Sequence, residues 1–79
     1  MEIIMEQLLS ILRSIKPGVD FEKEENLIED GIITSLEIVN LVVEISNEFD
    51  IEISPLDIVP ENFASAKTIM ELIERLADE

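Results

Sequence analysis

Residues 34–37 read Thr34-Ser35-Leu36-Glu37, a sequence typical of the start of a helix. A threonine followed three positions later by a glutamate can form a capping box, in which each side chain satisfies a backbone N–H of the other residue. Thr34 is then the N-cap and Ser35 the first helical residue of a helix of about 15 residues, which ends near Asp50. Because Thr34 does the capping, the Ser35 hydroxyl is free at the positive end of the helix dipole, a favourable place for an attached phosphate.

This predicted helix carries apolar side chains on two sides. At about 100° per residue, one arc forms a stripe suited to the core: Ile38, Leu41, Val42, Ile45 and Phe49. A second arc, roughly opposite, contains Leu36, Val39 and Val43. Three glutamates lie on one flank between the arcs: Glu37, Glu44 and Glu48. Two interpretations of the second arc stay open: the preceding loop folds over it, or it stays exposed and docks partner proteins that the carboxylates steer in.

The residues before this helix predict a first helix and a long loop. Apolar residues recur at helical spacing over residues 2–15: Ile4, Leu8, Ile11, Leu12 and Ile15. Pro17-Gly18 ends that helix. Residues 19–34 show no sustained periodicity, and we expect a loop held to the core by isolated apolar side chains: Phe21, Leu27, Ile28, Ile32 and Ile33.

The residues after the central helix predict two further helices. Residues 51–53 alternate like a strand, but three residues without a partner strand make a strand improbable. Ser54 followed by Pro55 predicts the start of a short helix that Val59-Pro60 ends. Ser65 is the predicted cap of a last helix, whose buried stripe consists of Ile69, Leu72, Ile73 and Leu76. The chain is therefore predicted to be all-α, a small four-helix bundle with three main helices, a short third helix and a long loop between the first two.

Size and charge narrow the possible functions. A chain of 79 residues predicts a single domain over residues 1–79 that buries only about 60% of the surface of its unfolded form, which leaves little room for a deep pocket. Nineteen acidic against five basic residues give a net charge of −14. Such a molecule repels phosphate backbones and anionic lipids and attracts basic protein surfaces. We therefore expect protein partners and a monomer that binds no nucleic acid.

Several residue types needed for catalysis are missing from the sequence. It contains no Cys and no His, so it lacks a thiol nucleophile, the usual proton shuttle at neutral pH and the usual zinc ligands. We therefore expect neither an enzyme nor a metal site. An acidic residue follows Met1, and no apolar run approaches the roughly 20 residues of a transmembrane helix. The expected location is the cytoplasm, without membrane insertion.

Taken in order, these features resemble the acyl carrier protein family. Members carry 4′-phosphopantetheine on a serine of an Asp-Ser-Leu type motif at the start of their second helix. The resemblance covers nearly the whole chain: length, acidity, the long loop, Gly31, Ser35-Leu36, an acidic Glu37, the apolar helix that ends in residues 48–53, and a short helix before the last one. Residues 60–65 and Ile69 look more like the D-alanyl and related aminoacyl carrier proteins.

The resemblance implies a cofactor, partners and site residues. Ser35 would receive phosphopantetheine from coenzyme A through a phosphopantetheinyl transferase that uses Mg²⁺, and the arm would carry an acyl or aminoacyl thioester. A chain without Cys needs its thiol supplied in this way. Further partners would be an adenylating or acyl-loading enzyme and downstream acyl-transferring enzymes with basic surfaces. Thr34 stands where the family usually has Asp, so one negative charge beside Ser35 is absent and modification would be slower or need a dedicated transferase.

The sequence leads to two hypotheses about function, which belong to different classes of protein. In the first, Ser35 holds phosphopantetheine, Leu36, Val39 and Val43 dock partners, and the three glutamates of the flank steer basic enzymes. In the second, the chain is an unmodified acidic adaptor that binds a basic protein through its second helix. The cargo stays open under the first, since an aminoacyl group, a fatty acyl chain and a polyketide unit all fit a carrier in lipid or secondary-metabolite biosynthesis.

Overall fold

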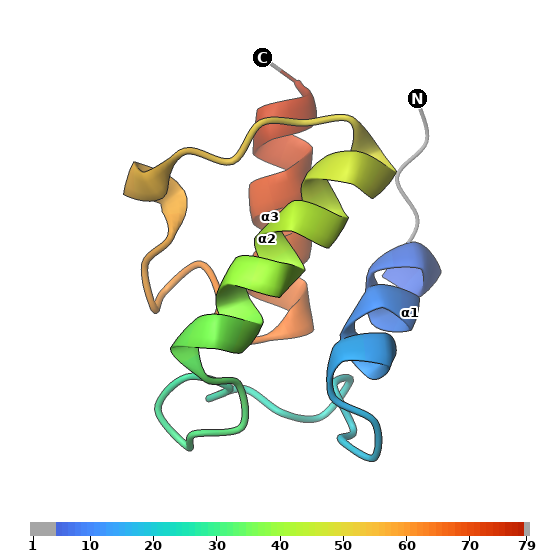
Figure 1. Cartoon of the computed structure of the whole chain (residues 1–79), viewed down its shortest axis with the longest axis vertical. Coiled ribbons are helices and arrows are strands. Elements are labelled where there is room, and N and C mark those ends of the chain that lie inside the picture. Colours follow the sequence, from blue (N-terminus) through green and yellow to red (C-terminus); the bar gives the residue numbers. More distant parts are fainter. Residues whose placement is uncertain (1–4, 79) are drawn as a thin grey trace.

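The computed structural model describes residues 5–78, and within this range the chain forms three α-helices and one turn of 3-10 helix (Figure 1). The elements are α1 (Met5–Ile15), α2 (Ser35–Phe49), η1 (Pro55–Asp57) and α3 (Ala66–Ala77). No strand occurs between residues 5 and 78. The all-helical class predicted from the sequence is therefore confirmed. Residues 2–4 of the predicted first helix, Ile4 among them, lie outside the described residues.

The boundaries of α2 follow from its terminal residues. Thr34 is the N-cap and forms the predicted capping box with Glu37. At the other end Asp50 adopts a left-handed conformation with φ 53° and donates its backbone N–H to the Ser46 carbonyl. A left-handed residue satisfies carbonyls of the last turn and redirects the chain, so the helix ends at Phe49. Both ends agree with the sequence prediction.

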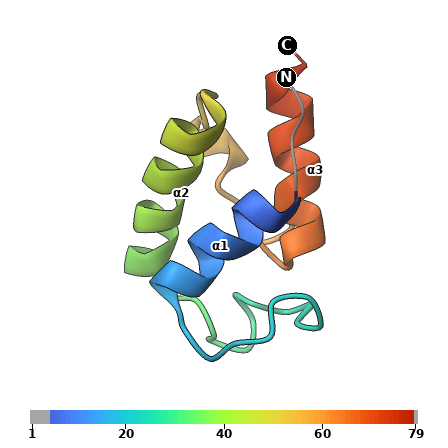
Figure 2. The ribbon, with the colours of Figure 1, turned by 90° about the vertical axis from the view of Figure 1, so that its right-hand side faces the viewer.

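The core lies where the three α-helices meet. Three of the five residues of the predicted α2 stripe are buried, Leu41, Ile45 and Phe49, whereas Ile38 and Val42 are partly buried. From α3 the buried residues are Ala66, Ile69, Met70, Leu72 and Ile73. Helix α1 contacts both α2 and α3, and Figure 2 shows it crossing between them. Because α1 has a neighbour on each side, it also buries Leu9, which the predicted stripe did not include.

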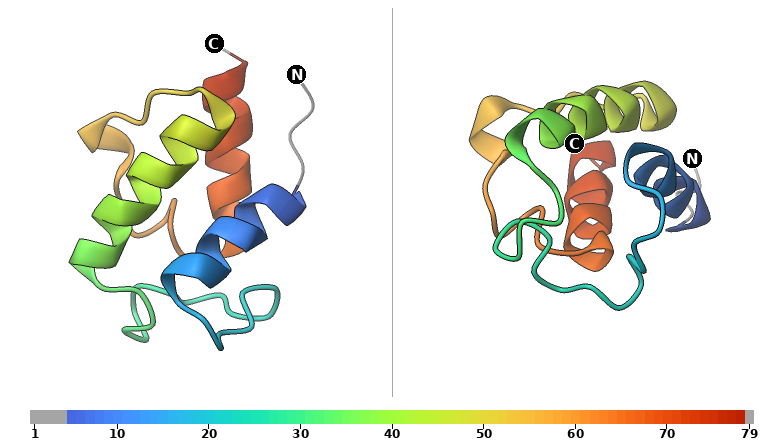
Figure 3. Two further views of the ribbon diagram at one scale, coloured as in Figure 1. Left: turned by 45° about the vertical axis from the view of Figure 1, so that its right-hand side comes forward. Right: turned by 60° about the horizontal axis from the view of Figure 1, so that its bottom comes forward.

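The segment between α1 and α2 passes across one end of the three helices (Figure 3, right). Phe21, Leu27 and Ile33 insert buried side chains into the core from this segment. The Leu27 backbone N–H donates to the Ala64 carbonyl over 2.9 Å, which ties the segment to the residues just before α3. The start of α2 is thereby fixed relative to the region around residue 63.

The predicted short third helix is not confirmed as an α-helix: within residues 5–78 the chain forms three α-helices and one 3-10 turn, Pro55–Asp57. The local start is as predicted, because Ser54 is the cap and Pro55 opens the turn. The turn ends after Asp57. Pro60 disfavours helical backbone at the residue before it, and Leu56 is 88% exposed, so the turn buries no apolar face that would stabilise a longer helix.

Candidate functional site

The Ser35 hydroxyl lies at the exposed N-terminus of α2, as predicted. Ser35 is the first helical residue and is exposed. Thr34 precedes it in extended conformation, and its Oγ1 accepts a hydrogen bond from the Glu37 backbone N–H over 3.4 Å. Thr34 thus performs the capping, and the neighbouring Ser35 is accessible.

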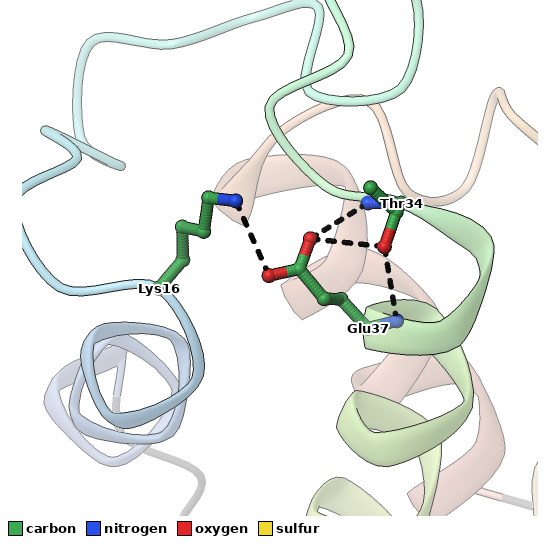
Figure 4. A network of polar contacts seen from close by, with 3 residues as sticks. All are labelled: Lys16, Thr34 and Glu37. Carbon is green, nitrogen blue, oxygen red and sulfur yellow. Dashed lines mark hydrogen bonds and ion pairs between the residues drawn. The ribbon is translucent and has the colours of Figure 1, made fainter.

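Glu37 is held by a small network that joins α2 to the end of α1 (Figure 4). Its Oε1 accepts hydrogen bonds from the Thr34 backbone N–H over 2.9 Å and from Thr34 Oγ1 over 3.1 Å. Its Oε2 lies 3.3 Å from Lys16 Nζ. The hydrogen bond from the Thr34 backbone, together with the Thr34 hydroxyl and the Lys16 ammonium, lowers the pKa of Glu37. The sequence places Glu37 on the flank of three glutamates but gives no sign of Lys16 as its partner.

Removing the cap should weaken α2 at the end that carries Ser35. We expect Thr34→Ala to lower the free energy of unfolding by about 1 kcal/mol, because the Glu37 backbone N–H loses its acceptor. Thr34→Ser is the control, since a serine hydroxyl can both accept from the Glu37 backbone N–H and donate to Glu37 Oε1 as threonine does, and it should retain wild-type stability. Urea denaturation at neutral pH measures both. Equal losses in the two variants would contradict the capping role of Thr34.

The charge on Glu37 should make part of the stability depend on pH. The pKa of the Glu37 carboxyl is lowered in the folded protein, so the ionised form stabilises the fold at pH values above the ordinary glutamate pKa, and this contribution disappears as pH falls through the lowered pKa. We expect Glu37→Gln, which keeps the side-chain length, to be less stable than wild type at pH 7 and to converge with it at acid pH. A constant difference from pH 7 to 3 in urea titrations would refute this role of the charge.

The second apolar arc of α2 is exposed. Leu36, Val39 and Val43 are 79%, 58% and 54% exposed. The segment between α1 and α2 therefore does not cover them, and the first of the two interpretations is wrong. Large apolar side chains that are exposed together on one helix of a small protein commonly mark an interaction surface.

The glutamates of α2 face the α1 side. Glu44 and Glu48 line a hollow together with Glu6 and Gln7 of α1. Gln7 Nε2 donates to Glu48 Oε2 over 3.2 Å. Glu37, Val43 and Glu44 also line a hollow with Ser14 and Ile15, residues near the C-terminal end of α1. The predicted steering residues thus lie beside the apolar arc, on the side of α2 that faces α1.

A groove that was not predicted from the sequence opens on the other side of Ser35. It measures about 360 Å³ and is lined by Ile28, Ser35, Ile38, Val39, Ile58, Val59, Pro60 and Phe63. Ser35, Ile38 and Val39 share one side of a helix because they are three and four positions apart. The opposite wall comes from residues 58–63, which only the tertiary structure brings to α2. Helical spacing could have indicated the α2 wall, but no local signal marks the other.

Within residues 5–78, neither a metal site nor a membrane-crossing helix is found. No group of three or more carboxylates is arranged to hold a metal ion there. No helix of the described part has both the length and the apolar character needed to cross a bilayer. The chemistry available at the N-terminus of α2 is an accessible hydroxyl beside an apolar groove and an acidic flank.

A family comparison agrees with this arrangement. The sequence model described as "Phosphopantetheine attachment site" matches residues 3–76, almost the whole chain. The family attaches 4′-phosphopantetheine as its prosthetic group, and its members act as carriers that interact with modifying and acyl-handling enzymes. An exposed serine at a capped helix start suits such an attachment, because the donated group is a phosphate. The chain belongs to the phosphopantetheine attachment-site family, consistent with an acyl carrier protein.

Proposed function

We propose that this protein is an acyl or aminoacyl carrier whose Ser35 holds the phosphopantetheine arm. The observation that carries the proposal is the exposed Ser35 at the first position of α2, with the capping done by Thr34. The serine lies within the matched residues 3–76. Its hydroxyl is accessible to an enzyme, and a phosphate attached there lies at the positive end of the helix dipole.

The attachment is a transfer from coenzyme A. Ser35 Oγ attacks the phosphorus that bears the pantetheine, a new O–P bond forms, and the pyrophosphate P–O bond breaks. Adenosine 3′,5′-bisphosphate leaves, and the hydroxyl proton passes to a base of the transferase. Mg²⁺ bound by that enzyme neutralises charge on the phosphates. The carrier supplies only the nucleophilic oxygen, so the catalytic groups belong to the transferase.

The loaded form is a thioester on the arm. The chain contains no Cys, so the sulfur must come from the prosthetic group, and the protein has no thiol of its own to compete for the acyl group. Because the sequence also lacks His, all bond-making steps are assigned to partner enzymes. The carrier is accordingly no enzyme itself.

Partners are proposed to dock on α2. The exposed side chains of Leu36, Val39 and Val43 give an apolar contact surface that starts one residue from Ser35. Glu44 and Glu48 lie beside it, and Glu37 contributes the carboxylate that the Lys16 contact partly neutralises. An acidic rim speeds encounter with basic surfaces, and apolar burial then holds the complex. The proposed partners are a phosphopantetheinyl transferase, an adenylating or acyl-loading enzyme and acyl-transferring enzymes.

Residues 1–79 are proposed to act as one domain and as a monomer. The proposed location is the cytoplasm, because the attachment consumes coenzyme A. The net charge of −14 opposes self-association of identical molecules through mutual repulsion.

Intact-mass measurement tests the proposal. Purified protein is incubated with coenzyme A, Mg²⁺ and a broad-specificity transferase, and we expect the mass to rise by one phosphopantetheine group per chain. Omission of the transferase should leave the mass unchanged. A reference carrier protein in the same tube shows that the transferase is active. If the reference gains mass and this protein, although folded, does not, the proposal is overturned and an unmodified binding domain remains.

A further inference from the structure

The first turn of α2 presents less negative charge than the composition of the chain suggests. The chain has nineteen acidic and five basic residues, yet Glu37 is the one acidic residue in this turn. The cap before it is the uncharged Thr34. The next carboxylate on α2 belongs to Glu44, which lies roughly 14 Å farther along the helix axis than Ser35. An enzyme that approaches Ser35 along α2 thus meets Glu37 before any other charge of this helix.

Lys16 neutralises that carboxylate. Its Nζ lies 3.3 Å from Glu37 Oε2, and the two side chains are 39% and 22% exposed. The other three ion pairs among residues 5–78 have longer distances of 3.9 or 4.0 Å, and every side chain in them is more than half exposed. Water and salt screen a partly buried pair less than an exposed one. The charge of Glu37 is therefore more firmly paired than the other carboxylates in these ion pairs.

The two side chains are anchored separately. The Lys16 backbone N–H donates to the Leu12 carbonyl over 2.9 Å, which continues the last turn of α1. On the other side, the Thr34 backbone N–H and hydroxyl hold Glu37 Oε1 (Figure 4). Glu37 would therefore keep its position without Lys16, and its Oε2 would then be open to a cation from a partner. Lys16 shields an anion that the capping box has already placed two residues from Ser35.

We infer that Lys16 is a specificity-determining residue, which weakens the binding of enzymes that contact the start of α2 through a basic side chain. The inference rests on the proposed attachment at Ser35 and adds the class of partner that the carrier favours. A basic side chain gains little from a carboxylate that is already paired with an ammonium group. An enzyme that covers the 79% exposed Leu36 with apolar side chains is unaffected. The favoured partners contact the first turn through apolar groups and place their basic residues farther along α2, where Glu44 and Glu48 lie.

Lys16 also has a purely structural interpretation. A cation at the C-terminal end of a helix stabilises that helix through its dipole, and Lys16 directly follows α1. If this were its whole role, its loss would weaken the fold but would leave the affinity of an enzyme for the folded protein unchanged. The shielding role predicts that the affinity for a basic enzyme increases. Kinetics can therefore distinguish the two roles.

Steady-state kinetics of phosphopantetheine transfer test the inference. The transferase used is one whose KM for a reference carrier rises with salt, which shows that it binds carriers through basic residues. We expect Lys16→Gln to lower the KM for the carrier about threefold at low salt with kcat unchanged, because Glu37 becomes available to the enzyme. The gain should disappear at high salt. Lys16→Arg keeps the positive charge and should keep the wild-type KM.

Two further variants distinguish the shielding of Glu37 from a change in total charge. Lys23 pairs with Asp20 over 3.9 Å in the segment between α1 and α2. Lys23→Gln thus also removes one positive charge and frees one carboxylate, but not a carboxylate of α2, and it should keep the wild-type KM. A double variant with Lys16→Gln and Glu37→Gln should return KM to the wild-type value, because the pair contributes no net charge. Circular dichroism checks that all variants fold.

The outcomes separate this inference from the proposed function. Failure of the wild type to gain mass with the transferase would remove the carrier function and the inference with it. Normal modification with an unchanged or raised KM in Lys16→Gln would overturn the inference alone, and so would an equal gain in Lys23→Gln. The same gain in the double variant would also overturn it, since Glu37 would then not be the group that Lys16 shields.

Discussion

Ser35→Ala will take up no phosphopantetheine under conditions that convert wild-type protein completely. The variant lacks the oxygen that must bond to the phosphorus, and the neighbouring Thr34 hydroxyl is engaged with Glu37 in the cap. Its fold should be intact, because Ser35 is exposed and Thr34 forms the cap. We expect the free energy of unfolding to change by less than about 0.5 kcal/mol, as for most surface substitutions. Intact mass and urea denaturation measure the two effects.

A second exposed serine provides the matched control. Ser10 lies on the exposed side of α1, and Ser10→Ala should be modified like the wild type. Mass gain in Ser35→Ala would place the attachment elsewhere. Loss of modification together with a large loss of stability would show that Ser35 is needed for folding. That result would contradict the expectation from its exposed position.

Leu36→Asp will reduce kcat/KM for phosphopantetheine transfer by about 30-fold or more, the size of effect that a central apolar contact residue gives. Leu36 is 79% exposed and is adjacent to Ser35, so an enzyme that reaches the serine must cover it. The substitution places a carboxylate where the partner buries apolar surface. Stability should change little, because the side chain contributes almost nothing to the core.

Leu56→Asp is the control for that experiment. Leu56 is even more exposed, at 88%, and belongs to η1 and not to α2. Both variants add one negative charge, so a general electrostatic effect on the transferase would appear in both. We expect Leu56→Asp to remain within threefold of wild type. Equal losses in the two variants, or no loss in Leu36→Asp, would contradict docking on α2.

The start of α2 could be predicted because its determinants are local. Thr34 and Glu37 are three residues apart, and a capping box depends on that spacing alone. The same holds for the core stripe, whose buried members follow helical periodicity. The identity of the N-cap in turn indicated that Ser35 is accessible. This much of the site is therefore encoded within a few consecutive residues.

Other features depend on contacts between distant segments. Lys16 reaches Glu37 only because α1 ends beside the start of α2, and Leu9 is buried only because α1 has two neighbours. The 3-10 turn began as predicted, but its length was set by the lack of a buried face around Leu56. The groove needs residues 58–63 against α2. Periodicity within one segment carries no information on such pairings.

Localising the arm in modified wild-type protein tests the central claim most directly. The protein is converted by the transferase and digested, and fragment ions are recorded across the peptide that contains Thr34, Ser35 and Leu36. We predict one phosphopantetheine group, with every fragment that contains Ser35 carrying it and no fragment that ends at Thr34 carrying it. The group on Thr34 or on another serine would contradict the account.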